Sequence, residues 1–373
     1  MTISEKLQYY HTLHSVNLEK LKLSSIREVM KLYKRLRDDL VAEIAKIDPT
    51  DPLRQSARNQ RTEKLLQQSN IIIAQGYAEI QKRAGVEMKD AAVFETGFAQ
   101  QAINRSVGIE LATVAVPAAT LNEIVKDTVI QGAASRMWWK RQSGALQNRF
   151  ADTIRMHMLR SSTLNDIVRA IRGTRENNYT DGIMVSSTRD AEALIRTSVQ
   201  TVANRAAEEF YRENDDVIQG YIWISTLDDR TTEICMVRDG LQYDLNYEPI
   251  GHSIPWLEGP GAIHWNCRSR SMPALKDYKG MSKAKQEAIR NAGVRSSQFG
   301  YVKRNVRYEA WLKEQDQKRP GFADRVLGTD KARLWRGTGL SLRDLVNGDG
   351  KSMTAEALRS RYASEWKTVF QED

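Results

Sequence analysis

The feature that most constrains the fold is an apolar residue at every third or fourth position over long stretches of the first 150 residues. From Val29 onward, the positions with this spacing are Val29, Tyr33, Leu36, Leu40, Ile44 and Ile47. In an α-helix they lie on one face, which can then be buried. The pattern ends at residues 48–52, where Pro49 and Pro52 prevent the helix from continuing.

Helical spacing returns after these prolines. A second predicted helix buries Leu65, Leu66, Ile72, Ile73, Tyr77 and Ile80. Further helices are predicted over residues 87–105, 121–160 and 188–214, the last with Thr188 as its cap. Residues 109–117 are rich in β-branched side chains and end in Pro117, which predicts an extended connector.

At residue 218 the apolar spacing changes to a period of two. Ile218, Tyr221 and Trp223 therefore predict a strand, with Trp223 packed under the helix over 188–214. The chain from there to Pro273 is rich in turn residues. This part of the chain is predicted to combine helices with a small irregular sheet.

Charge divides the chain into three regions. Residues 1–150 carry a net charge of +6, residues 151–270 of −5 and residues 271–373 of +8. The acidic region contains no lysine, and all its cations are arginines, which suit packed positions because they form planar, bidentate pairs. We predict an α+β protein with a long α-helical N-terminal arm (1–150), a compact α+β middle domain (151–274) and a basic, mostly helical C-terminal arm (275–373).

Composition indicates the cellular compartment in which the chain folds. Two cysteines in 373 residues indicate folding in a reducing compartment. The sequence turns polar directly after Met1, and no apolar run approaches the ~20 residues of a membrane span. We expect an intracellular protein with no secretory signal and no membrane partner.

A set of motifs between residues 188 and 274 occurs in a recognisable order. The helix carries Ala191, Glu192, Arg196, Thr197 and Asn204; the strand carries Tyr221, Trp223 and Ser225; the turns carry Asp228, Asp229, Arg230, Thr231, Cys235, Asp239 and Gly240; the last motif is His264, Cys267, Arg268 and Pro273. This order and spacing resemble the Mu F-like minor head proteins of tailed phages, the phage head morphogenesis family. Residues 311–358 are similar to the tail that follows that domain in many such proteins.

The resemblance implies a non-enzymatic structural protein of the virion head, near the portal vertex and assembled in the host cytoplasm. Its implied partner is the portal protein, bound through the N-terminal helices, which could also self-associate. The major capsid protein or scaffold and packaged double-stranded DNA, contacted without sequence preference, are further implied partners. The implied roles are head morphogenesis and DNA packaging or ejection. A DNA-binding internal or ejected virion protein is the first alternative, and a metal-dependent enzyme fused to a head domain is the second.

Family members often carry two more cysteines, but Thr232 and Ser269 stand at those positions here. The resemblance implies that Cys235, His264 and Cys267 lie together. Three ligands are one short of a closed zinc site, so we expect no cofactor and a hydrogen-bonded cluster in which His264 binds backbone or Asp239. Zinc or a disulfide between the cysteines would be the other outcomes. We also expect Arg230 and Arg268 to pair with Asp228, Asp229 or Asp239.

Catalytic motifs are weakly represented. The chain has five histidines, no Gly-x-Ser-x-Gly and no phosphate-binding Gly-x-x-x-x-Gly-Lys motif. Arg336 resembles the arginine of ADP-ribosyltransferases, but no Glu-x-Glu follows it, so we expect a solvated cation there. For DNA, the candidate contacts are the basic pairs Lys140 and Arg141, Lys303 and Arg304, and Lys318 and Arg319.

Overall fold

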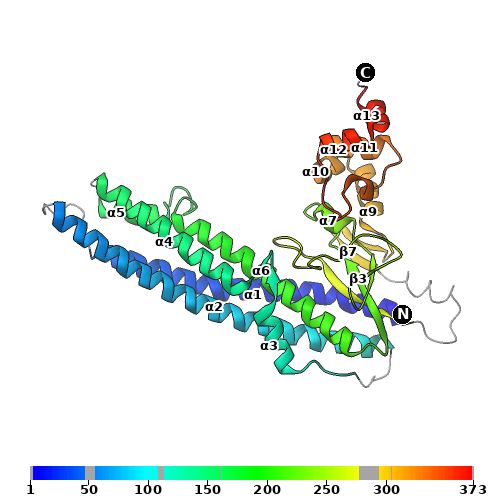
Figure 1. The fold of residues 1–373 in the computed structure, drawn as a ribbon, viewed down its shortest axis with the longest axis horizontal. Coiled ribbons are helices and arrows are strands. Elements are labelled where there is room, and N and C mark those ends of the chain that lie inside the picture. The colour runs from blue at the N-terminus through cyan, green and yellow to red at the C-terminus, as the bar shows by residue number, and fades with distance from the viewer. Residues whose placement is uncertain are drawn as a thin grey trace. The chain divides into compact units, whose positions relative to one another are not determined.

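The computed structural model describes residues 3–46, 55–107, 113–160, 162–276, 294–303 and 305–371 (Figure 1). The helices are α1 (Ile3–Ile44), α2 (Gln55–Val107), α3 (Ala118–Asp127), α4 (Ser135–Leu159), α5 (Leu164–Arg172), α6 (Ile183–Glu213), α7 (Glu233–Met236), α9 (Tyr308–Lys318), α10 (Phe322–Leu327), α11 (Thr329–Gly337), the 3-10 helix η1 (Leu342–Leu345), α12 (Ala355–Arg361) and α13 (Ala363–Phe370). The strands are β1 (Val129–Ile130), β2 (Ala133–Ala134), β3 (Ile218–Ile224), β4 (Gln242–Asp244), β5 (Pro249–Ile250), β6 (Arg270–Leu275), β7 (Val294–Ser297) and β8 (Gly300–Lys303).

The chain divides into two compact units that are not consecutive in sequence. Unit 1 contains Met1–Asn17, Ala92–Ala118 and Ala203–Asp373, and unit 2 contains Leu18–Ala91 and Ala119–Val202. Helices α1, α2 and α6 each run from one unit into the other. The three consecutive regions predicted from charge therefore do not coincide with the packed units, because packing follows apolar helix faces while charge is a property of the surface.

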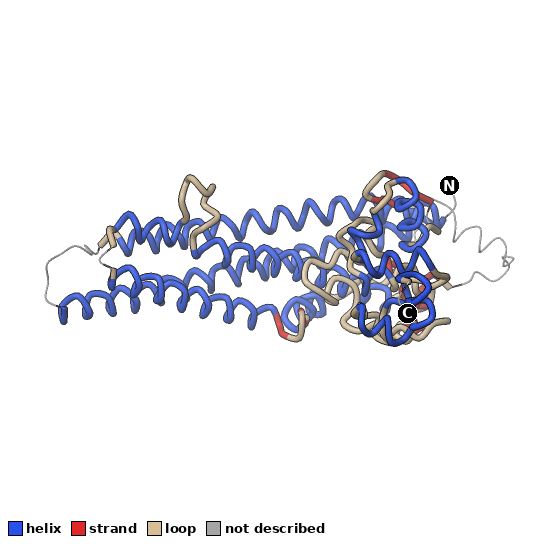
Figure 2. Tube along the Cα trace, turned by 90° about the horizontal axis from the view of Figure 1, so that it is seen from above, coloured by secondary structure: helices blue, strands red, loops and turns tan. Residues whose placement is uncertain are grey.

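Unit 2 is a bundle of long helices. Parts of α1, α2, α4 and α6 lie side by side in it (Figures 1 and 2). The apolar positions predicted for the first two helices are buried, apart from Ile72, which is half-buried, and Ile47, which lies outside the described residues. Polar contacts cross the bundle as well: Ser25 donates to Glu87 (2.7 Å), and the fully buried Lys22 donates to Gln200 (2.8 Å). The helical N-terminal region is confirmed.

The helix predicted over residues 87–105 is part of the continuous helix α2, and two other predicted helices also have different bounds in the structure. The helix predicted over residues 121–160 is interrupted, since α3 ends at Asp127 and the β1–β2 hairpin turns at Gly132, where φ is +77°. Gln131 also has a positive φ (+47°), and this tight turn, which the glycine makes easier, interrupts the helical path despite the apolar spacing. The helix predicted over residues 188–214 is α6, which begins earlier, at Ile183. Thr188 therefore lies inside it and does not cap it, and its hydroxyl donates to the carbonyl of Met184 (2.9 Å).

Unit 1 is built around a four-stranded antiparallel sheet in the order β5-β4-β3-β6. Ile218, Tyr221 and Trp223 of β3 are buried, as predicted. Ile218 and Tyr221 are three residues apart, and they point into one core because the register with β6 shifts between Ile218 and Gly220. Helix α6 covers this core, where the rings of Tyr211 and Tyr221 lie 6.3 Å apart.

The C-terminal region is mostly helical, as predicted, but it is not a separate arm. Helices α9 to α13 contribute Trp311, Leu312, Phe322, Leu358 and Trp366 to the same hydrophobic core as β3. The predicted class is thus confirmed: an α+β fold with long N-terminal helices and a mostly helical C-terminal region. Among the described helices, none is both long enough and apolar enough to span a bilayer.

The start of the chain joins unit 1 through a buried ionic cluster. Glu95 of α2 accepts from Arg270 of β6 and bonds to His14 of α1 (2.6 Å), whose ring stacks on Phe98. The neighbouring guanidinium and imidazole lower the pKa of Glu95, although burial alone would raise it. This cluster ties both N-terminal helices to the sheet.

Replacing Trp223 tests the assignment of the unit 1 core. The indole is buried, lies edge-on to Trp256 (5.4 Å between centroids) and donates to the hydroxyl of Ser225 (3.1 Å). We expect Trp223→Ala to lower the free energy of unfolding by about 3–5 kcal/mol, because it leaves a large cavity. Denaturant unfolding measures this, with Tyr301→Ala, at a side chain 73% exposed, as the control. Equal midpoints for both variants would contradict the assignment.

Candidate functional site

The candidate site lies where the chain leaves and rejoins the central sheet. Strand β3 leads into the irregular segment 225–269, which ends at β6. The two strands are antiparallel neighbours, with Trp223 opposite Ser271 and Ile224 opposite Arg270. Because of this pairing, the start and the end of the segment lie close together although they are more than 40 residues apart.

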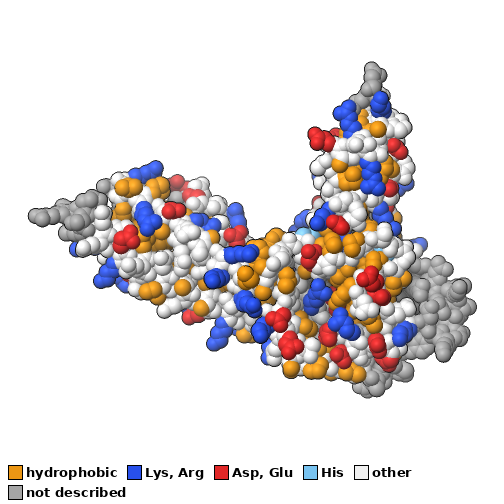
Figure 3. All heavy atoms as spheres, viewed as in Figure 1, with side chains coloured by type: hydrophobic (Ala, Val, Ile, Leu, Met, Phe, Trp, Pro, Cys, Tyr) orange, Lys and Arg blue, Asp and Glu red, His pale blue; other side chains and the backbone are white. Residues whose placement is uncertain are grey.

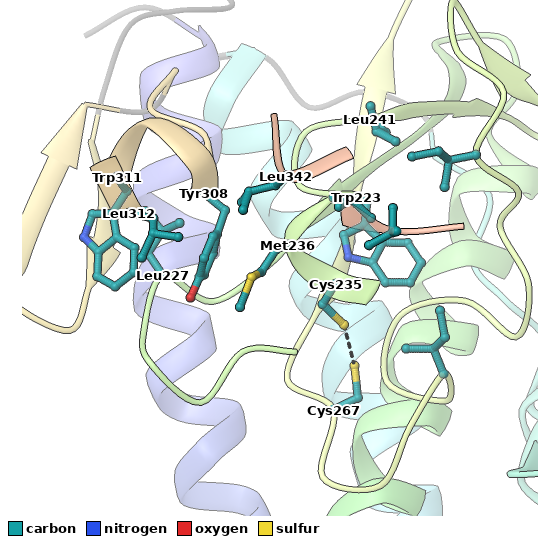
Figure 4. Packing of buried hydrophobic residues seen from close by; sticks show 14 of the residues in the cluster. Trp223, Leu227, Cys235, Met236, Leu241, Cys267, Tyr308, Trp311, Leu312 and Leu342 are labelled. Carbon is teal, nitrogen blue, oxygen red and sulfur yellow. Dashed lines mark hydrogen bonds between the residues drawn. The ribbon is translucent and has the colours of Figure 1, made fainter. Parts of the chain in front are cut away.

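Cys235, His264 and Cys267 come together in this segment, as the resemblance implied. Figure 4 shows the side chains of the two cysteines pointing toward each other. Cys235 lies on the single-turn helix α7, and the other two lie in the turn before β6. The sulfur atoms are 3.8 Å apart, and Nε2 of His264 is 3.2 Å from the sulfur of Cys235. Both thiols are free and buried, and His264 is half-buried.

Hydrogen bonds orient this cluster. Nδ1 of His264 donates to the backbone carbonyl of Trp265 (2.9 Å), and Nε2 lies 2.9 Å from the hydroxyl of Thr232. The backbone N–H of Gly261 donates to the sulfur of Cys267 (3.3 Å). Of the two partners expected for His264, the backbone is the one found.

The two thiols have different acidities. Burial raises the pKa of Cys235 well above its usual value, because a thiolate there would be desolvated. Burial acts in the same direction on Cys267, but hydrogen bonds from Cys235 and His264 outweigh it and hold the pKa of Cys267 well below its usual value. The same contact raises the pKa of His264 against the effect of its burial.

Asp228 and Arg268 form the bidentate pair expected for Arg268. Both guanidinium Nη atoms donate to the carboxylate, and the bond between Nη2 and Oδ1 measures 2.8 Å. The same carboxylate accepts from the hydroxyl of Thr231 (3.0 Å) and the N–H of Arg230 (3.2 Å). Asp228 thus closes its own turn and links it to the end of the segment.

Asp239 has a different partner from those expected. Both Nη atoms of Arg295, on β7, donate to its carboxylate at 2.8 and 3.0 Å. The carboxylate also accepts from the backbone N–H of Ser225 and of Tyr308, each at 2.9 Å. At the next residue, Gly240, φ is +81°, and a Cβ would lie 2.2 Å from the guanidinium carbon of Arg307. Both residues therefore join the segment to the C-terminal region.

The expected ion pair of Arg230 with Asp228 is present, but it is long and exposed. The side chain of Arg230 is 77% exposed, and its closest carboxylate oxygen, on Asp228, is 3.9 Å away. Arg268 already occupies that carboxylate with better geometry, so Arg230 remains at the surface. Asp229 uses its backbone N–H, which donates to the side chain of Gln298 (3.0 Å).

The helical part of the motif is split between the two units. Arg196 and Thr197 belong to the portion of α6 in unit 2, where the hydroxyl of Thr197 donates to the carbonyl of Ala193 (2.7 Å). Asn204 lies in unit 1, and its amide donates to the carbonyls of Pro260 (2.8 Å) and Ser269 (3.1 Å). Of these three residues, Asn204 positions the segment that holds the cluster.

Two buried arginines of the site were not among the predicted residues. Arg295 is described above, and Arg238 donates to the backbone carbonyls of Ile234, Pro255 and Asp349. The absence of lysine from the acidic region could have identified Arg238, since it predicts buried arginines there. No local pattern identifies Arg295, whose partner is 56 residues away.

The candidate DNA contacts lie on separate elements. Lys140 and Arg141 are exposed on α4, with the guanidinium of Arg141 4.6 Å from the ring centroid of Trp138. Lys303 is exposed, and Arg304 lies outside the described residues. Lys318 pairs with Glu314, and Arg319 stacks on Phe299 at 3.7 Å and donates to Gln315.

Several of these cations therefore have intramolecular partners. On the face drawn in Figure 3, Lys and Arg side chains are interspersed with Asp and Glu. The side chain of Arg336, expected to be a solvated cation, forms ion pairs with Asp316 and Asp324 and is about one third exposed.

Comparison with models of known protein families, with curated proteins and with solved structures finds no match for this chain. The geometry of the described residues therefore carries the functional argument together with the motif resemblance.

The difference between Arg268 and Arg230 can be measured. Lysine keeps the charge but loses the planar fork, so Arg268→Lys should lower the free energy of unfolding by about 1.5–3 kcal/mol, the value of a hydrogen bond between charged groups. Arg230→Lys should leave it unchanged, because that side chain forms no close pair. Denaturant unfolding of both variants tests this. Equal losses would leave general charge, and not the fork, as the explanation.

Acid should weaken the bond at Asp228. Burial favours the neutral acid, but the hydrogen bonds from Arg268 outweigh it and place the folded pKa below the ordinary value of 3.8. The stabilisation by this carboxylate is therefore complete above pH 3.8 and is lost as the pH falls through the folded pKa. We expect the difference in unfolding free energy between wild type and Asp228→Asn to shrink from pH 6 to pH 3. A constant difference would contradict this assignment.

Proposed function

We propose that this chain is a structural, non-enzymatic minor head protein of a tailed phage, associated with the portal vertex and acting in head morphogenesis. The observation that carries the proposal is that motif residues about 40 positions apart contact one another in unit 1: Asp228 binds Arg268, and Cys235 contacts His264 and Cys267. These are the residues through which the sequence resembles the Mu F-like family. Their convergence supports a common fold of this segment.

The contacts of these residues support a structural role. Arg268 donates to the carboxylate of Asp228 at the other end of the segment. The carboxylate of Asp239 accepts hydrogen bonds from backbone N–H groups. Asn204 and Arg238 satisfy backbone carbonyls of the irregular segment. Groups engaged in this way hold the irregular segment in one shape, which is a structural role.

We assign docking on the portal protein, or self-association, to the N-terminal helices. The major capsid protein or scaffold and packaged double-stranded DNA are further partners in this proposal. Placement in the virion head near the portal, after assembly in the host cytoplasm, follows from the same assignment.

Assembly of heads in the presence and absence of portal tests the proposal. The tagged full-length chain would be co-expressed with the major capsid, scaffold and portal proteins of its phage, and particles would be separated by sedimentation. We expect the chain to sediment with heads that contain portal and to be absent from heads assembled without it.

Equal incorporation without portal would overturn the portal association. Absence from both kinds of head would overturn the role in the head. Retention of the free chain on nonspecific DNA, lost as salt is raised, would favour the DNA-binding alternative, because phosphate contacts are salt-dependent.

A further inference from the structure

We propose that Cys235, His264 and Cys267 bind one Zn²⁺ ion, with a water molecule next to Thr232 as the fourth ligand. This inference goes beyond the proposed function and does not depend on it. The sequence favours no metal, because Thr232 and Ser269 replace two possible thiolates. The positions of the remaining three side chains favour a bound metal ion.

The spacing of the three ligand atoms fits a tetrahedral zinc ion. Zn–S bonds of about 2.3 Å at a tetrahedral angle place two sulfur atoms ~3.8 Å apart. The sulfur atoms of Cys235 and Cys267 are 3.8 Å apart, and Nε2 of His264 is 3.2 Å from the sulfur of Cys235. A disulfide would need the two sulfur atoms at about 2.05 Å.

The histidine presents the correct nitrogen. A carbonyl oxygen can only accept, so the bond to Trp265 fixes the proton on Nδ1 of His264. Nε2 is the atom that faces the sulfur of Cys235, at 3.2 Å. Zinc-bound histidines almost always donate their second ring nitrogen to a carbonyl or carboxylate, which orients the ring. The N–H of Gly261, 3.3 Å from the sulfur of Cys267, supplies a similar supporting bond to a thiolate.

The fourth position faces the exposed side of the cluster. Thr232 is exposed and its hydroxyl lies 2.9 Å from Nε2 of His264, whereas both thiols are buried. A water bound on this side would lie within reach of the Thr232 hydroxyl. Three protein ligands and one water make a complete tetrahedral zinc site, so the loss of two cysteines from the motif still leaves enough ligands.

A bound ion would add metal–ligand bonds between two elements whose cysteine and histidine side chains already contact each other. It would attach α7, through Cys235, to the turn before β6, through His264 and Cys267. Binding energy of a structural zinc adds directly to folding free energy, so the ion would stabilise the irregular segment.

Metal analysis of the full-length protein tests the proposal. Protein prepared with zinc and dialysed against metal-free buffer should retain about one zinc per chain, measured by elemental analysis. Cys235→Ser, Cys267→Ser and His264→Gln should each weaken zinc binding by more than about tenfold in competition with a chromophoric chelator, since even outer-sphere partners contribute that much. His252→Gln is the matched control, because His252 binds the carbonyl of Gln242 at 2.8 Å and lies outside the cluster.

A variant that adds a ligand keeps the test informative if the three ligand variants fail to fold. Thr232→Cys places a thiol at an exposed position next to Nε2, so it should fold and bind zinc more tightly than the wild type. Wild type that retains no zinc and shows two titratable thiols would overturn the proposal. Wild type without zinc and without titratable thiols would overturn it in favour of a disulfide. Zinc binding unchanged in all three ligand variants would show that the ion binds elsewhere.

Discussion

The carboxylate of Asp239 joins segments that are far apart in the sequence, and unit 1 depends on this connection. It accepts from the end of β3 through Ser225, from β7 through Arg295 and from the start of α9 through Tyr308. A buried charge is costly unless it is paired and fully hydrogen-bonded, and here four donors meet it. The segments that supply these donors must therefore be in place together, so the C-terminal region cannot fold as an independent arm.

Most of the helical fold could be predicted from spacing alone. The faces of α1 and α2 were predicted correctly because burial of one helix side repeats every three or four residues. The interruption at residues 128–134 was not predicted, since it is made by a two-residue turn with positive φ at Gln131 and Gly132 and the flanking apolar pattern continues across it. The division into units could not be predicted either, because the same helices serve both.

The sequence predicted which residues form the candidate site better than it predicted which of them bind each other. The grouping of Cys235, His264 and Cys267 followed from the motif resemblance, as did the importance of Asp239. The partner of Asp239 could not be found, because Arg295 lies beyond the range of any local spacing rule. Arg230 was expected to pair because it stands beside two aspartates. Its pair with Asp228 is long, at 3.9 Å, because Arg268 occupies that carboxylate with closer hydrogen bonds.

The absence of lysine from residues 151–270 has a physical explanation in this segment. Residues 225–269 contain little regular structure, so their backbone carbonyls need side-chain donors. Arg238 meets this need from a fully buried position because one guanidinium reaches three carbonyls, on Ile234, Pro255 and Asp349. A lysine ammonium is a strongly hydrated point charge and would be costly to bury there. The arginine content of the segment thus follows from the fold it must maintain, and the charge pattern of the sequence records a packing requirement as well as a surface property.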